Sequence, residues 1–423
     1  MVSHALSRQV AFFIETNFVV GGPTNWAVNG TYIYCIDPDI SGVVQESVEN
    51  ANNRLRPRAA HPNILTLKNS SASFGLYMHA SPAAAAEGAA AVTYHVAELI
   101  YAALGGRDLG YAAAVVSSEL EDGDEIEIDA DPGYAVGDWI YAFDTSAGVG
   151  EFYRIEAIAE GPPITLTLDR ELHFVADPGG ADTIRAVIDC FVHQSATTQH
   201  DHSDHKTLQL LVQGDAGDDV YECKGCKPSF TIEPITAGEP TRLSFELLVT
   251  TFELEDAIKV AFGAGVPVGE AGAVPGVATS TYFKLADFGS PLAETVARGS
   301  ITASPGVAYE RVTGPNGHEG VHGHVDTLEL PTLEVMVPFD TTYSAEYRAK
   351  QEKHALIQVG DGTQSWGIYY PRLDYSAEPA RSDEGGLTTH ALTFAALENP
   401  GDGGLEGDNL EKWRSGFHLL IVA

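Results

Sequence analysis

Apolar and polar residues alternate between Lys206 and Thr250 in a pattern that predicts a three-stranded antiparallel β unit. Thr207–Gln213 is an apolar-rich strand, and the Gly- and Asp-rich segment after it favours a tight turn into a long strand, Val220–Glu233. After a loop with two prolines, Arg242–Val249 returns with every second residue apolar. This alternation is typical of an antiparallel strand with one buried face.

A second copy of this pattern occurs near the C-terminus. Ala355–Val359, Ser365–Tyr375 and Leu387–Leu397 repeat the three strands, with a Gly-Asp-Gly turn after the first and a Pro/Gly-rich loop before the last. In this alignment Pro228 matches Pro371. We interpret the pattern as a duplicated β domain, because a repeat this long is a domain rather than a solenoid unit. A chance resemblance between two hairpins is the alternative.

The pattern predicts one long helix. Ser81 is a favourable N-cap, and Pro82 suits the first helical position because its missing N–H costs nothing there. Apolar residues recur at helical spacing through Ala83–Leu104, and Gly105–Gly106 should end the helix. A shorter helix, Ser344–Lys353, occupies the corresponding place in the second copy.

The expected fold is therefore mainly β, with two sandwich- or barrel-type domains that are each flanked by a helix. Five short strands between Val115 and Cys190, separated by turns rich in Gly, Pro and Asp, predict a small inserted SH3-like barrel. The predicted boundaries are 1–114 with 191–262 for the first domain, 115–190 for the inserted barrel, 263–280 for a linker, and 281–423 for the second domain.

Composition narrows the classes of function. The formal net charge of −35 argues against a protein that binds DNA by neutralising phosphates over most of its surface. The charge is consistent with solubility in a salty habitat or with a surface that must not adhere to a polyanion. Without a run of 18 apolar residues we expect no membrane insertion, and the N-terminus does not resemble a secretory signal. Four cysteines are too few for a disulfide scaffold of this length.

One group of residues has the chemistry of a metal site. His202 and His205 precede the predicted hairpin, and Cys223 and Cys226 form a C-x-x-C in its second strand. Two thiolates and two imidazoles could hold zinc. The alternative is a solvated polar loop and two strand cysteines that point to the same face. We find no catalytic constellation, and we expect neither an enzyme nor a cofactor.

Several features in this order resemble the major tail (tail tube) proteins of long-tailed, siphovirus-like bacteriophages. They are a first strand with Glu15-Thr16, an arm-like segment Glu46–Arg58, the helix Ala83–Leu104 ending in Leu-Gly-Gly, the strand pattern Cys226–Val249, and the insertion at 115–190. The resemblance covers most of residues 1–260 and, through the duplication, more weakly 281–400.

The resemblance implies a structural virion protein whose rings stack into a tail tube, the conduit for DNA ejection. A duplicated member would form a trimeric, pseudo-hexameric ring, whereas six chains would be needed if the second copy were an immunoglobulin-like decoration. The implied partners are copies of the chain itself and the tape-measure, tail-terminator and baseplate proteins. DNA would pass through without specific binding. The implied location is the virion tail, assembled in the host cytoplasm.

In such a tube the predicted hairpins would form the inner wall. The polar side chains that we expect to face the channel are Gln209, Gln213, Glu222 and Gln358. Contacts between rings are expected from the apolar C-terminal segment Phe417–Val422 and from three arginines clustered in an otherwise acidic chain, Arg54, Arg56 and Arg58.

Two other classes of function compete with a tube subunit. One is an acidic cell-surface or S-layer-like β protein of a halophile, which should carry a secretion signal. The other is a carbohydrate-active β-sandwich enzyme, which should gather aromatic residues and carboxylates in one cleft. The four tryptophans are instead spread over different predicted elements.

Overall fold

The computed structural model is mainly β, as expected. It describes residues 8–15, 19, 26, 30–33, 35–41, 45–48, 64–68, 70–78, 95–108, 114–119, 123–128, 133–145, 147–159, 161, 163–172, 182–192, 206–214, 220–255, 259, 281–318, 321–327, 329–360, 362, 365–384, 386–399, 412 and 414–422. The helices within these ranges are too short or too polar to cross a membrane.

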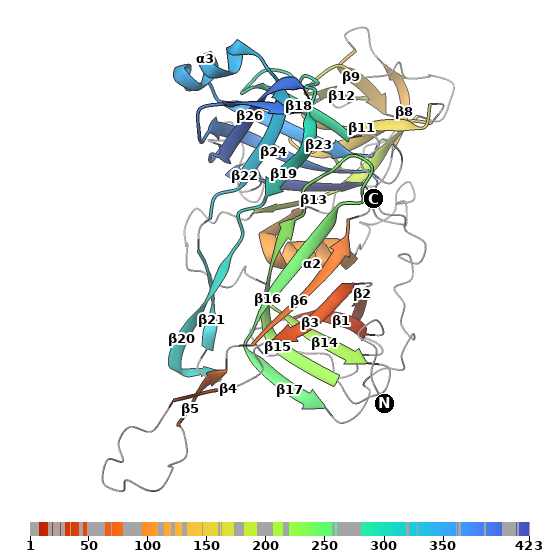
Figure 1. Cartoon of the computed structure of the whole chain (residues 1–423). Coiled ribbons are helices and arrows are strands. Elements are labelled where there is room, and N and C mark those ends of the chain that lie inside the picture. Colours follow the sequence, from red (N-terminus) through yellow and green to blue (C-terminus); the bar gives the residue numbers. More distant parts are fainter. Residues whose placement is uncertain are drawn as a thin grey trace, which may run out of the picture.

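The N-terminal part of the chain forms an antiparallel sheet with the strand order β2-β1-β14-β15-β16-β6-β3 (Figure 1). Its strands are β1 (Arg8–Ile14), β2 (Thr31–Ile33), β3 (Ile36–Ser41), β6 (Ser70–Tyr77), β14 (Leu208–Gly214), β15 (Val220–Ile232) and β16 (Arg242–Val249). Strand β17 (Thr251–Glu255) continues beyond β16 along β15. The alternation predicted for β16 is confirmed, because every second residue from Leu243 to Val249 is buried.

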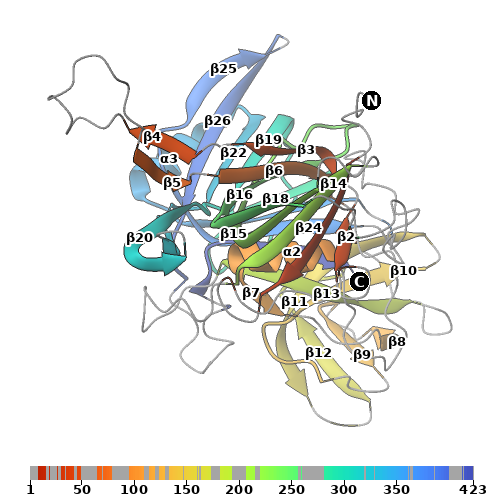
Figure 2. The same cartoon turned by 90° about the horizontal axis from the view of Figure 1, so that it is seen from below.

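The C-terminal part forms a second antiparallel arrangement with the order β18-β23-β24-β26-β22-β19. Its strands are β18 (Thr281–Asp287), β19 (Arg298–Ser304), β22 (Thr332–Pro338), β23 (Lys353–Val359), β24 (Trp366–Tyr375) and β26 (Leu387–Ala396). Strand β25 (Ala380–Glu384) pairs with β26, so the expected Pro/Gly-rich loop is partly a hairpin, and Figure 2 shows this hairpin extending from the sheet.

The two sheets share one topology. Along the chain, β1, β3, β6, α2 (His95–Leu104), β14, β15 and β16 correspond to β18, β19, β22, α3 (Thr341–Ala349), β23, β24 and β26. The order across each sheet is also the same. We call these two sets the N-terminal repeat and the C-terminal repeat. The domain boundaries given above stay predictions.

Each repeat also carries a hairpin between its second and third strands. In the N-terminal repeat this hairpin is β4 (Gln45–Val48) with β5 (Ile64–Lys68), and in the C-terminal repeat it is β20 (Tyr309–His318) with β21 (Val321–Asp326). The segment expected to be irregular from Ser47 onward therefore begins as a strand. Both hairpins lie at the periphery of the chain (Figures 1 and 2).

The strand registers of the two repeats also agree. Seven residue pairs join β1 to β14 and seven join β18 to β23. A β-bulge interrupts the next pairing at the same point of each repeat: Leu208 opposes Cys226 and Leu210 opposes Cys223, while Lys353 opposes Leu373 and Ala355 opposes Tyr370. This register corrects our alignment of Pro228 with Pro371, because Pro228 follows Cys226 whereas Pro371 precedes Leu373.

Between α2 and β14 the chain forms a closed ring of paired strands. The ring runs β10-β11-β12-β9-β8-β13 and returns to β10. Its strands are β8 (Ala114–Glu119), β9 (Glu125–Ile128), β10 (Trp139–Asp144), β11 (Val149–Ala159), β12 (Ile164–Leu168) and β13 (Thr183–Val192). Six strands take part rather than the expected five, and their side chains enclose a separate apolar cluster around Ile140 and Tyr153.

The C-terminal strand β27 (His418–Val422) is buried inside the chain. It lies between β13 and β24 and pairs with both. All five side chains are buried, and each fully buried aliphatic side chain contributes about 1.5–3 kcal/mol. Our expectation that this apolar segment contacts a neighbouring ring is therefore wrong, because the segment joins the six-stranded ring to the C-terminal repeat.

The two helices differ in burial. Helix α2 lies between the N-terminal sheet and β13 (Figure 1), and its side chains from Val96 to Leu104 are buried except Glu98 and Tyr101. The predicted end at Leu104 is confirmed, and Gly105, with φ of 90°, starts β7 (Gly105–Asp108). Helix α3 begins three residues earlier than expected, because Asp340 accepts a hydrogen bond from the Thr342 N–H at 2.9 Å.

Candidate assembly interface

Of the four residues considered as zinc ligands, the structure describes only the two cysteines. Cys223 and Cys226 are free, buried thiols within the main apolar cluster. Burial raises the pKa of the Cys226 thiol well above its ordinary value, so the thiolate that a metal needs is disfavoured. His202 and His205 lie outside the described residues. Among the residues that the structure describes, no cluster of His, Cys, Asp or Glu could hold a metal ion.

The side chains expected to face a channel are covered by the chain itself. Gln209 and Gln213 are only 2% and 0% exposed, because a small cluster around Trp26 and Leu211 covers that face of β14. Gln358 is equally buried, and its amide donates to the Gly150 carbonyl at 2.8 Å. These three residues correct our expectation, which had assumed that one face of each hairpin was open.

The fourth residue expected to face the channel is Glu222, and the residues expected between rings are three arginines. The carboxylate of Glu222 is mostly covered and lies 3.8 Å from Lys224 Nζ and 3.7 Å from Lys259 Nζ, so it is engaged in ion pairs. Arg54, Arg56 and Arg58 lie outside the described residues, and their role in ring contacts stays a prediction.

The contact between the two repeats begins at the loop after β15. Ile235 in this loop and Ile301 in β19 exchange two backbone hydrogen bonds, of 2.8 and 3.0 Å. Both side chains belong to the apolar cluster that extends through both repeats. The loop of the N-terminal repeat is thus seated on the edge strand of the C-terminal repeat.

The hairpin β20–β21 extends this contact. The Tyr309 hydroxyl donates to the Ala103 carbonyl at the end of α2, at 2.5 Å. Arg311 donates to the carbonyls of Ser70 and Val249, the latter at 3.2 Å. Backbone carbonyls at the end of α2 and in two strands of the N-terminal repeat therefore accept hydrogen bonds from side chains of the C-terminal repeat. These bonds fix the orientation of one repeat relative to the other.

Lys227 is buried beneath this hairpin. Its ammonium donates to the carbonyls of Ala102 at 2.7 Å and Lys206 at 3.2 Å, and it lies 4.3 Å from the centre of the Tyr309 ring. Burial lowers the pKa of Lys227 to about 7. The side chain can therefore change charge near neutral pH at the contact between repeats.

A second buried polar cluster holds the C-terminal segment. Lys412 lies 2.7 Å from Asp108, 3.1 Å from Asp138 and 3.9 Å from Asp189. Burial alone would lower the pKa of Lys412, but the three carboxylates outweigh it and raise that pKa. His418 Nδ1 lies 3.0 Å from both oxygens of Asp189.

A third cluster joins the six-stranded ring to the C-terminal repeat. Arg170 donates to Glu151 at 2.7 Å and to Asp169 at 2.8 Å, and Lys284 of β18 also contacts Glu151. Burial would raise the pKa of Glu151, but Arg170 and Lys284 hold it below its ordinary value. The carboxylate is therefore a charged link between β11 and β18.

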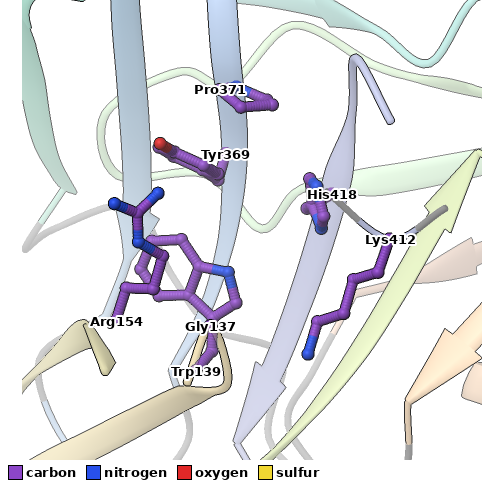
Figure 3. Close-up of a pocket in the computed structure, with 7 residues that line it drawn as sticks. All are labelled: Gly137, Trp139, Arg154, Tyr369, Pro371, Lys412 and His418. Atoms are coloured by element: carbon purple, nitrogen blue, oxygen red, sulfur yellow. The ribbon is translucent and has the colours of Figure 1, made fainter. Parts of the chain in front are cut away.

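A small pocket lies where these segments meet, and Figure 3 shows its lining side chains. The lining residues are Gly137, Trp139, Arg154, Tyr369, Pro371, Lys412 and His418. The Trp139 and Tyr369 rings are 4.7 Å apart between centres, and Lys412 and His418 already contact carboxylates. The pocket therefore lies at a structural junction, where the six-stranded ring, β24 and the C-terminal segment pack together.

Sequence reasoning missed all of these charged residues. Lys227 follows the C-x-x-C that was assessed only as a metal ligand pair, and its position within a predicted strand was the available signal. The partners of Lys412 and Glu151 are remote in the sequence, so pattern alone does not bring them together. No protein-family model and no curated protein matches the chain.

Proposed function

We propose that this chain is a structural subunit that assembles with copies of itself into rings, and that these rings stack into the tail tube of a long-tailed bacteriophage. A ring would contain three chains and six repeats. The observation that carries the proposal is the shared topology of the two repeats, including the hairpin between the second and third strand of each. Two matching units on one chain can alternate around a pseudo-sixfold axis.

The charge of the chain supports the same proposal. With a net charge of −35, the chain as a whole repels nucleic acid. A conduit for DNA benefits from a wall to which the phosphates do not adhere. The strands that would line the channel are not the polar faces first expected, because three of those four side chains are buried.

The mass of the smallest assembled particle tests the proposal. Three chains of 45.0 kDa give a particle of about 135 kDa, and six give about 270 kDa. We expect mass photometry of the purified protein to find the smaller of these two species. Electron microscopy should then find particles with a central hole and stacked tubes at higher concentration. Discrete particles without a central hole would contradict the proposal.

A further inference from the structure

The contact between the two repeats of one chain lies at the loop after β15 and near the end of β6. On the N-terminal repeat, the loop around Ile235 pairs with β19 of the C-terminal repeat. Met78, which follows β6, donates its backbone N–H to Thr241 at 2.9 Å beside the start of β16 and is fully buried in the shared apolar cluster. The loop around Ile235 is thus paired with the C-terminal repeat, and Met78 lies in the apolar cluster that extends through both repeats.

Phe339 holds the corresponding position in the C-terminal repeat. It directly follows β22, the counterpart of β6, and donates its backbone N–H to Thr388 in β26 at 3.2 Å. Yet its side chain is 43% exposed, whereas that of Met78 is 0% exposed. Leu387, at the start of β26, is 50% exposed. The two repeats thus place an apolar residue at the same position, but only one of the two is covered.

Strand β25 occupies the place of the loop around Ile235. Among the described strands it pairs only with β26, so its other edge presents backbone donors and acceptors. Arg381 of β25 stacks over the Phe339 ring, with 5.4 Å between guanidinium and ring centre. We call Phe339, Leu387, Arg381 and this open edge the Phe339 surface.

The matching partner elements are present in the N-terminal repeat. Strand β3 is the counterpart of β19, and the β4–β5 hairpin is the counterpart of β20–β21. Within the described part of the chain, β3 pairs only with β6, and β4 and β5 pair only with each other. In the described part of the chain, these elements are therefore the counterparts of the β19 edge and the hairpin that contact the N-terminal repeat within the chain.

We propose that the Phe339 surface binds the N-terminal repeat of a second copy of this chain, through β3 and the β4–β5 hairpin. The contact would repeat between chains the arrangement that joins the repeats within each chain. This inference rests on the proposed function, and it adds which surface makes the contact and which part of the second copy binds there. Because each copy uses two different surfaces, the contact is head to tail, and it closes into a ring when the rotation from one copy to the next is a whole fraction of a turn.

Pro38 limits the number of backbone hydrogen bonds that this contact can contain. Pro38 in β3 has no backbone N–H, so β3 cannot reproduce every hydrogen bond that β19 makes. Apolar contact by Phe339 and Leu387 must therefore contribute much of the affinity. Buried aromatic residues near the centre of an interface are the usual source of binding energy.

The Phe339→Asp variant tests the proposal, with Val296→Asp as the matched control. Val296 is another apolar residue of the C-terminal repeat, 60% exposed and outside the Phe339 surface. We expect Phe339→Asp to weaken self-association by at least about tenfold in a concentration series by sedimentation velocity. Val296→Asp should associate like the unmodified chain. Both variant monomers should retain the unmodified melting temperature within a few degrees.

Hydrogen exchange provides an independent readout. In the assembled protein, backbone amides of β3 and β25 should exchange more slowly than in the monomer, and this protection should be absent in Phe339→Asp. Rings that form equally well from Phe339→Asp, without protection of β25, would overturn the inference and leave the proposed function intact. An unmodified chain that stays monomeric at every concentration would overturn both.

Discussion

At the scale of single residues, Lys227 is a buried side chain whose charge depends on its surroundings. Burial disfavours the charged form and lowers the pKa to about 7, because it outweighs the opposing attraction of Asp326. In the unfolded chain the ordinary value is 10.5. Between these two pH values the unfolded state binds more protons than the folded state. The contribution of Lys227 to stability therefore rises with pH across this range.

Replacing Lys227 with Met should remove this pH dependence. We expect the stability of the unmodified chain relative to Lys227→Met to increase from pH 7 to pH 9.5, by at most about 1.4 kcal/mol per pH unit. Urea unfolding at several pH values measures the difference. Lys224→Met is the control, because Lys224 is partly exposed on the same strand and pairs with Glu253 at 3.2 Å. Parallel profiles for Lys227→Met and the unmodified chain would contradict the prediction.

At the scale of elements, the bulge in β15 decides which side chains enter the core. In a regular strand, residues three apart point to opposite faces. The extra residue at Lys224–Gly225 places both Cys223 and Cys226 opposite residues of one face of β14. Gly225 has a φ of 60°, and its N–H donates to the buried carboxylate of Glu15 at 2.9 Å.

The Gly225→Ala variant should destabilise the chain by about 2–4 kcal/mol. A left-handed backbone costs a residue with a Cβ about 1–2 kcal/mol, and this Cβ would lie 2.7 Å from Val19 Cγ2 and 2.9 Å from Thr250 Cβ. Gly238→Ala is the control, since Gly238 has a φ of 82° but nothing within 4 Å of the added Cβ. Denaturant unfolding should give the larger loss for Gly225. Equal losses would show that crowding at the bulge contributes little.

Elements were easier to predict than the contacts between them. The alternation in β16 and the Gly-rich end of α2 are local signals, and both were read correctly from the sequence. The burial of Gln209 and Gln358 was not predictable from local pattern: Trp26 packs on Leu211 on the Gln209 face of β14, Gln358 donates to the Gly150 carbonyl, and both partners are remote in the sequence. The same holds for β27, whose apolar sequence requires a cover but does not identify β13 and β24 as its neighbours.

At the scale of the whole molecule, net charge opposes the proposed assembly. Each chain carries a charge of −35, so copies that approach one another repel. The Phe339 surface offers apolar side chains and a strand edge, which salt does not weaken. Added salt screens the repulsion instead, because the Debye length falls from about 10 Å at 0.1 M to about 3 Å at 1 M.

Ring formation should therefore strengthen with salt. We expect the apparent dissociation constant for the ring to fall several-fold between 0.1 and 1 M NaCl, measured by sedimentation velocity on the unmodified chain. Stacking of rings should respond in the opposite direction if Arg54, Arg56 and Arg58 form ion pairs with the next ring, since exposed pairs weaken in salt. Ring mass and tube length, followed in the same salt series, separate the two contacts. A ring that dissociates as salt rises would mean that ion pairs, rather than the Phe339 surface, hold the copies together.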